Sequence, residues 1–118
     1  MPEKITFSPQ LIDTHCLIDV RTPLEFVEDH IPGAHNVPLL TDEERVEVGT
    51  IYKQVGPIEA RRRGLELTCS RFYDMVDRII SLSAGRPIVV YCWRGGLRSY
   101  SVATVSYTHL TLPTNREV

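Results

Sequence analysis

The sequence predicts an α/β domain built around a mainly parallel sheet, and two observations indicate this. Short apolar segments rich in β-branched residues, such as residues 16–20 and 88–92, have the character of buried strands. Segments with helical spacing of apolar residues separate them, an alternation typical of parallel strands joined by helices. The length of 118 residues and net charge of −2 indicate one soluble domain, without the basic excess that binds nucleic acid by charge alone.

The first third of the chain alternates short strands with short helices. Residues 4–7 are expected to form the first strand and "CLIDV", residues 16–20, the second. Thr22-Pro23 predicts a helix start, because proline is well tolerated at the first helical position. Residues 31–33, Ile-Pro-Gly, end that helix, and a further short strand is expected at "AHNVP", residues 34–38.

Longer helices are predicted for the middle of the chain. Thr41 and Glu44 fit a capping box, and Pro57 is expected to begin the next helix. We interpret Gly64 as a helix boundary rather than as a point of close backbone approach to a ligand. Gly-Arg-Pro at residues 85–87 then ends the helical region. Apolar residues recur at roughly helical spacing between these points, at Leu65, Phe72, Val76, Ile79 and Ile80.

The strand "IVVYC" delivers Cys92 to a loop with two glycines and two arginines. Ligands of open parallel sheets bind at the carboxyl ends of strands, so Cys92 is the candidate nucleophile. Glycines let successive backbone N–H groups turn inward as an anion nest, and a following helix would aim its positive end there. These groups favour the nucleophilic thiolate. The predicted anion-binding loop comprises Trp93, Arg94, Gly95, Gly96, Leu97, Arg98 and Ser99.

The other cysteines and the histidines are predicted to be structural. We expect Cys16 and Cys69 to be packed cysteines, whereas the loop after Cys92 favours a reactive thiol over a core cysteine at that position. Three cysteines without close pairs argue against a disulfide framework or a four-cysteine zinc site. No metal site is expected, because metal-ligand spacing is absent among the histidines His15, His30, His35 and His109.

Two motifs resemble the rhodanese superfamily. "IDVRTPLEFVEDHIPGAHNVP", residues 18–38, is similar to the front motif of that family, and "VYCWRGGLRS", residues 90–99, to its active-site loop. "DEERVEVGTIYKQVGPIEARRRG", residues 42–64, narrows the resemblance to the N-terminal domain of bacterial tRNA 2-selenouridine synthases. The resemblance implies a three-layer rhodanese-like fold. It also implies supporting roles near the loop, which we assign to Asp19, Arg21 and Gly64, the first two as a structural hydrogen-bonded pair.

The narrower resemblance also implies an activity, the exchange of sulfur for selenium at position 2 of the wobble uridine of tRNA. Selenophosphate is the implied donor, geranyl diphosphate the second co-substrate, and a geranylated 2-thiouridine the intermediate. Cys92 would carry the selenium, and no bound cofactor is implied. No apolar run approaches membrane-spanning length and no signal peptide is recognised, so we expect a cytoplasmic protein with tRNA as partner and no membrane partner.

The loop leaves other functions open. Cys92 and Arg98 have the Cys-x5-Arg spacing of cysteine phosphatases, some of which use the rhodanese fold. Simple sulfurtransferases of this fold tend to have a loop one residue shorter, and the longer loop favours a tetrahedral oxyanion, which selenophosphate also supplies. A generic sulfurtransferase, a phosphatase-like domain and an inert interaction module are therefore the alternatives.

The end of the chain predicts an incomplete domain. Residues 1–104 are expected to form a rhodanese-like domain truncated at its C-terminus, and residues 105–118 a non-native tail that resembles translated adapter sequence. The family's C-terminal P-loop domain has no counterpart, because G-x-x-x-x-G-K-[ST] does not occur here. In rhodanese-like domains a further strand lies between the first strand and the strand that carries the cysteine, and we expect this chain to lack it. "YTHLTL", residues 107–112, alternates with period two and could be drawn into the gap by accident.

Overall fold

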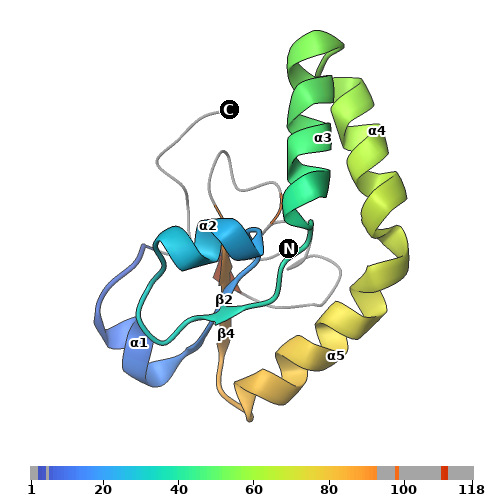
Figure 1. Ribbon diagram of the computed structural model, residues 1–118. Helices are drawn as coiled ribbons and strands as arrows, with labels where there is room; N and C mark the ends of the chain where they lie inside the picture. The colour runs from blue at the N-terminus through green and yellow to red at the C-terminus, as the bar shows by residue number, and fades with distance from the viewer. Residues whose placement is uncertain (1–2, 5, 93–97, 99–109, 112–118) are drawn as a thin grey trace.

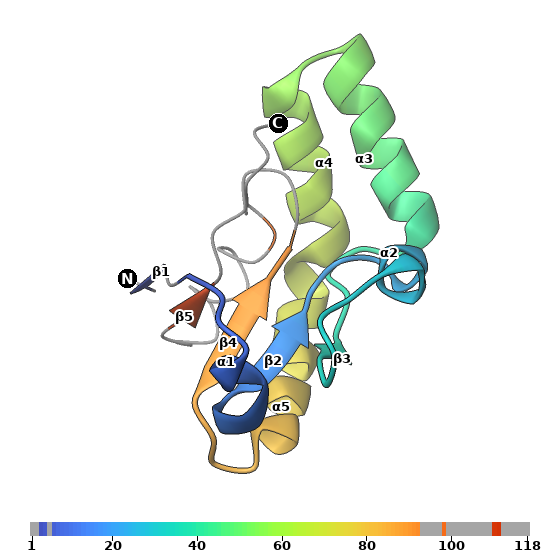
Figure 2. The same cartoon turned by 90° about the vertical axis from the view of Figure 1, so that its left-hand side faces the viewer.

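The structure is a computed structural model that describes residues 3–4, 6–92, 98 and 110–111. Its strands are β1 (Glu3–Lys4), β2 (Cys16–Asp19), β3 (His35–Asn36), β4 (Ile88–Tyr91) and β5 (Leu110–Thr111). Within the described residues they form one sheet of five strands in the order β1-β5-β4-β2-β3, and every pairing there is parallel. The predicted parallel α/β architecture is confirmed, and Figure 2 shows β2 and β4 side by side and pointing the same way.

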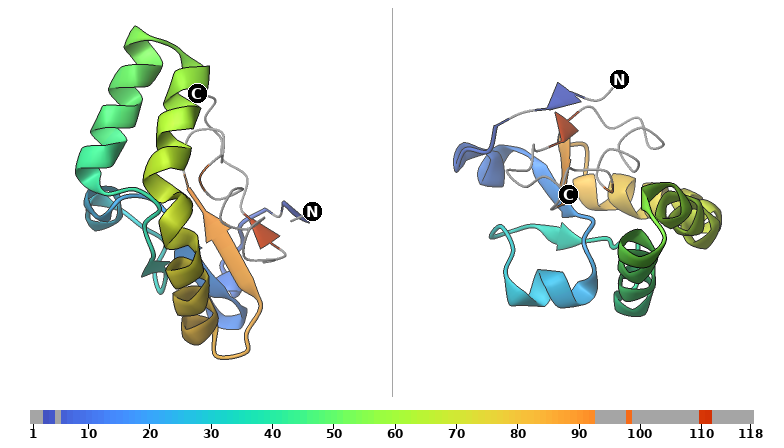
Figure 3. Two further views of the ribbon diagram at one scale, coloured as in Figure 1. Left: turned by 90° about the vertical axis from the view of Figure 1, so that its right-hand side faces the viewer. Right: turned by 90° about the horizontal axis from the view of Figure 1, so that it is seen from above.

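Helices cover both faces of this sheet. They are α1 (Gln10–Thr14), α2 (Pro23–Glu28), α3 (Asp42–Gln54), α4 (Pro57–Thr68) and α5 (Phe72–Ser83), with a 3-10 turn, η1 (Cys69–Arg71), between the last two. α1 lies against one face and α5 against the other, which gives three layers (Figures 2 and 3). α3 and α4 pack against each other as an antiparallel pair that extends beyond the sheet (Figure 1).

Two apolar clusters fill the space on either side of the central strands. Successive side chains of a strand point to opposite faces, so β2 contributes to both clusters. Ile18 packs in the larger cluster with Met75 and Ile79 of α5, whereas Leu17 packs in the smaller one with Leu11 of α1. Because the central strands are buried on both faces, they are almost continuously apolar rather than alternating.

Capping boxes fix the start of two helices. The Thr41 side chain accepts from the Glu44 N–H at 3.1 Å, and Glu44 Oε1 accepts from the Thr41 N–H at 2.9 Å, which confirms the predicted box at α3. Thr22 and Glu25 form the same motif at α2, with Pro23 at the first helical position as expected. Local sequence therefore determines where both helices begin.

Gly64 is a departure from prediction. α4 runs through it without interruption, so the expected helix boundary at this residue is wrong. A Cβ atom there would meet nothing within 4 Å, so close packing does not require the glycine. Packing of the surrounding helix overrides its weak helix propensity, which costs about 1 kcal/mol relative to alanine. The helical region does end where expected, with Gly85 in the left-handed region at φ +81°.

The first strand is also shorter than predicted. β1 consists of Glu3–Lys4, and Thr6 and Phe7 lie outside any strand, so the expected extent over residues 4–7 is wrong. Its partner is β5, with Glu3 opposite Leu110 and Lys4 opposite Thr111. β5 lies between β1 and β4, the place that the sequence prediction leaves without a strand. The predicted boundary at residue 104 lies outside the described residues and stays a prediction.

Candidate active site

Cys92 lies at the carboxyl end of β4, beside the carboxyl end of β2. Asp19 and Tyr91 are paired in the sheet, and the Val20 N–H donates to the Tyr91 carbonyl oxygen at 3.1 Å, immediately before Cys92. Cys92 is only 2% exposed and packs in the larger apolar cluster with Val20. The fold therefore places this cysteine at the carboxyl end of a central strand, which is where open parallel sheets bind ligands.

The predicted anion-binding loop begins directly after Cys92. Its residues Trp93, Arg94, Gly95, Gly96, Leu97 and Ser99 lie outside the described residues, so their role as an anion cradle stays a prediction. Arg98 is described, and its Nη1 and Nη2 atoms contact the two carboxylate oxygens of Glu25 at 2.8 and 3.4 Å. The end of the loop is therefore attached to α2, the helix that follows β2.

Asp19 and Arg21 form the hydrogen-bonded pair that the sequence predicts. Arg21 Nε lies 3.0 Å from both carboxylate oxygens of Asp19, its Nη2 donates to Oδ2 at 2.7 Å, and its backbone N–H donates to Oδ1 at 2.9 Å. Burial opposes the charge of Arg21, but the hydrogen bonds and charge of Asp19 outweigh it and raise the pKa of the guanidinium. Arg21 also donates to the Asp29 carbonyl oxygen and lies over the ring of Tyr91.

Tyr91 connects the Asp19–Arg21 pair to the segment between α2 and β3. Its hydroxyl accepts a hydrogen bond from the Ile31 N–H at 3.2 Å, which fixes the segment between α2 and β3. Burial, together with the charge of Asp19, raises the pKa of the Tyr91 hydroxyl. The residue that precedes Cys92 is thus a neutral side chain that braces the edge of the sheet.

Glu25 is the functional candidate that the sequence prediction missed. Its carboxylate joins three separate segments, because it accepts from Thr22 on its own helix, pairs with Arg98 after the loop and lies 3.2 Å from Nε of Arg45 on α3. The available signal was the Thr22-x-x-Glu25 spacing, which indicates a capping box but not a partner 73 residues away.

The environment of Glu25 keeps it ionised. Burial alone would raise its pKa, but the hydrogen bonds and charge of Arg98, the backbone of Thr22 and the charge of Arg45 together lower the pKa to about 2. Two guanidinium groups against one carboxylate leave a net positive charge beside the end of the predicted anion loop. This arrangement is compatible with an anionic substrate at the same edge of the sheet.

The remaining cysteines differ from each other. Cys16 is buried in the core as predicted, and burial raises the pKa of its thiol despite the opposing charge of Arg86. Cys69 is exposed at the start of η1, so its predicted packing in the core is wrong. The 3-10 turn faces its side chain outward, although the apolar residues Leu67 and Phe72 lie close to it in sequence.

The described residues contain no group of three or more His, Cys, Asp or Glu side chains arranged to hold a metal ion. His30 instead stacks on Phe26, with ring centroids 3.7 Å apart, and His35 belongs to β3. Across the same residues, none of the helices combines the length and apolar character that crossing a membrane requires.

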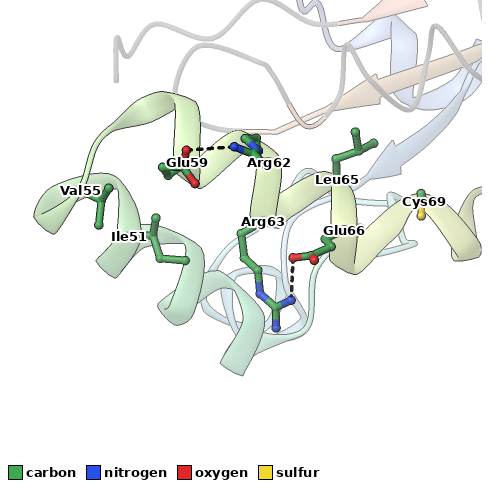
Figure 4. A pocket seen from close by; sticks show the side chains of 8 residues that line it. All are labelled: Ile51, Val55, Glu59, Arg62, Arg63, Leu65, Glu66 and Cys69. Carbon is green, nitrogen blue, oxygen red and sulfur yellow. Dashed lines mark hydrogen bonds and ion pairs between the residues drawn. The ribbon is translucent and has the colours of Figure 1, made fainter.

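A groove lies between α3 and α4, and Cys92 is not among the residues that line it (Figure 4). Its charged groups are paired, Arg62 with Glu59 at 3.3 Å and Arg63 with Glu66 at 3.0 Å. Two of the three arginines at residues 61–63 are therefore paired with carboxylates. The groove is lined by Ile51, Val55, Glu59, Arg62, Arg63, Leu65, Glu66 and Cys69.

A three-layer fold with a parallel sheet and a cysteine at the end of a central strand defines a rhodanese-like domain, and the sequence matches that family over residues 8–112. The chain belongs to the rhodanese-like domain family.

Its relatives narrow the comparison to proteins named tRNA 2-selenouridine synthase. The one from Pseudomonas syringae pv. syringae (strain B728a) is 42% identical over 88 residues, covering 73% of this chain and 24% of that protein. The one from Nitrosomonas europaea is 43% identical over 88 residues, covering 70% of this chain and 22% of that protein. The one from Pseudomonas putida (strain GB-1) is 36% identical over 103 residues, covering 86% of this chain and 28% of that protein. The chain thus spans about a quarter of the length of these relatives, matching their N-terminal domain.

A solved structure has the same fold. The N-terminal domain of a candidate ATP/GTP binding protein from Clostridium difficile 630 superposes with a TM-score of 0.80 at 32% identity, covering 93% of this chain and 91% of that one.

Proposed function

We propose that this domain handles the chalcogen in a tRNA 2-selenouridine synthase, with Cys92 as the nucleophile that carries it. The position of Cys92 at the carboxyl end of a central parallel strand is the observation that supports this role. The names of the relatives support the reaction class and tRNA as the substrate. A cytoplasmic location is part of the proposal, because tRNA is modified there.

Selenophosphate is the proposed selenium donor, and the loop from Trp93 to Ser99 is the proposed site for its oxyanion. Geranyl diphosphate is the proposed second co-substrate. The sulfur of the wobble 2-thiouridine would displace diphosphate from it. Selenium from selenophosphate would then replace the sulfur of the geranylated base, with geranyl thiol leaving the base and the phosphoryl group of the donor passing to water as phosphate. These steps belong to the whole protein. The ATP/GTP binding described for the Clostridium difficile neighbour fits a phosphate-binding domain beside this fold.

The role of Cys92 can be isolated with thiosulfate as a simpler donor. The Cys92 thiolate attacks the outer sulfur, the S–S bond of thiosulfate breaks, and sulfite leaves with the bonding electrons. The product is a Cys92 persulfide. Cyanide then attacks the terminal sulfur of the persulfide, thiocyanate leaves, and the thiolate is restored.

The test is thiocyanate formation from thiosulfate and cyanide by the wild type, Cys92→Ser and the control Cys69→Ser. We expect turnover by the wild type and by Cys69→Ser, none by Cys92→Ser, and inhibition by selenophosphate that increasing thiosulfate relieves. Hydrolysis of an aryl phosphate without thiocyanate formation would establish the phosphatase alternative instead. Absence of both activities in the folded wild type would contradict the proposed role of Cys92.

A further inference from the structure

We propose that Glu25 is a positioning residue, which fixes the guanidinium of Arg98 for binding an oxyanion beside Cys92. This inference rests on the proposed function, because it takes the loop after Cys92 as the anion site. It extends that function to a side chain outside the loop.

One short segment, residues 20–25, contacts Tyr91, which precedes Cys92, and Arg98, which belongs to the loop. At the start of the loop, the Val20 N–H donates to the Tyr91 carbonyl oxygen at 3.1 Å. At its end, Glu25 binds both Nη atoms of Arg98. Both contacts therefore come from a stretch of six residues that begins directly after β2.

The Glu25 carboxylate is itself held in place. Its Oε1 atom accepts from the backbone N–H of Thr22 at 3.0 Å and from the Thr22 hydroxyl at 3.1 Å, and Thr22 is 1% exposed. Arg45 contacts the same oxygen from α3 at 3.2 Å. A carboxylate fixed from two sides can orient a long, flexible side chain, and paired contacts to both oxygens define the plane of a guanidinium.

The pairing occupies only part of the hydrogen-bonding capacity of Arg98. A guanidinium carries five N–H donors, and the contacts to Glu25 come from one N–H on each Nη. The Nε–H lies outside these contacts. Glu25 can therefore fix Arg98 without using all the donors that an anion in the loop would need.

Positioning and simple electrostatics predict opposite effects of removing the charge of Glu25. A carboxylate close to an anion site repels the anion, so electrostatics alone predicts tighter anion binding by Glu25→Gln. Positioning predicts weaker binding, because Arg98 would have to be ordered by the anion itself. The direction of the change separates the two effects.

The test measures inorganic phosphate affinity as protection of Cys92 against iodoacetamide, in a Cys69→Ser background that removes the exposed thiol. We expect Glu25→Gln to bind phosphate about tenfold more weakly than the parent. Glutamine can still serve in a capping box, so α2 keeps its start. The matched control is Glu44→Gln, which removes an equivalent capping-box carboxylate that pairs with Arg71, and we expect its phosphate affinity to stay within about twofold of the parent.

Two further variants keep the proposal testable if Glu25→Gln does not fold. Arg98→Lys keeps the positive charge but cannot bind both carboxylate oxygens in the same plane, and we expect weaker phosphate binding. In an Arg98→Gln background, the additional Glu25→Gln change should have no further effect on affinity, because both act through one side chain. Unchanged or tighter binding by Glu25→Gln, or wild-type binding by Arg98→Lys, would overturn the positioning role alone. A parent that phosphate does not protect would overturn the anion loop and this role with it.

Discussion

At the residue scale, two oppositely charged side chains are buried at the carboxyl end of β2. Asp19 is fully buried, Arg21 is 2% exposed, and side-chain hydrogen bonds join the two. A buried ion pair contributes little net stability, but loss of one partner leaves an uncompensated buried charge. The pair therefore explains the conformation of this edge rather than the stability of the fold.

Asp19→Asn should destabilise the protein strongly, because it leaves the buried Arg21 guanidinium without its carboxylate. We expect a loss of about 3–5 kcal/mol in the free energy of unfolding, measured by urea denaturation. The control Glu59→Gln removes an exposed partner of Arg62 and should change that free energy by less than about 1 kcal/mol. Similar losses of unfolding free energy in the two variants would contradict the claim that burial makes the Asp19–Arg21 pair costly to break.

Glu25 should make stability depend on pH in the acid range. Its pKa is about 2 in the folded protein and 4.5 is the ordinary value, so its contribution is fully present above about pH 5 and is lost as the pH falls toward 2. We expect wild type to exceed Glu25→Gln by about 2 kcal/mol in the free energy of unfolding at pH 7, and this difference to shrink steadily below pH 5. Glu28→Gln, an exposed change on the same helix, serves as control. A difference that stays constant down to pH 2 would contradict the low pKa.

At the element scale, local signals identify where helices begin but not how they are connected in space. Thr41 and Glu44 are three residues apart, so the sequence alone predicts their box. The link between Glu25 and Arg98 joins segments that follow β2 and β4, two strands paired in the sheet, and no local pattern predicts it. The prediction of a helix boundary at Gly64 was wrong for the opposite reason. Tertiary packing continues α4 through a residue whose local propensity predicts a boundary.

Gly64→Ala tests the corrected position of Gly64 inside α4. The added Cβ meets no atom within 4 Å and alanine is the better helix former, so we expect a gain of about 0.5–1 kcal/mol in stability. Gly85→Ala is the opposite control, because a φ of +81° disfavours a side chain, and it should lower the melting temperature. Destabilisation by Gly64→Ala would contradict the open surroundings of Gly64 within α4.

At the scale of the whole molecule, alternation of strands and helices predicted the parallel sheet and the location of Cys92 at its edge. Strand order was less accessible, because β5 lies in a segment that the sequence predicts to be a non-native tail, although its alternating pattern at residues 107–112 allowed a strand in this gap. The outward side chain of Cys69 also depends on the turn between α4 and α5 rather than on its neighbours in sequence. The fold class was therefore predictable from patterns along the chain, whereas contacts between distant segments were not.

The identity of the chalcogen carrier is tested most directly by locating the sulfur atom on the protein. The folded chain is incubated with thiosulfate, desalted and examined by intact mass, and the modified peptide is then sequenced by mass spectrometry. We expect one added sulfur atom on Cys92, lost on addition of cyanide, present in Cys69→Ser and absent in Cys92→Ser. Sulfur found only on the exposed Cys69, or none on a chain shown to be folded, would contradict the assignment of Cys92 as the carrier.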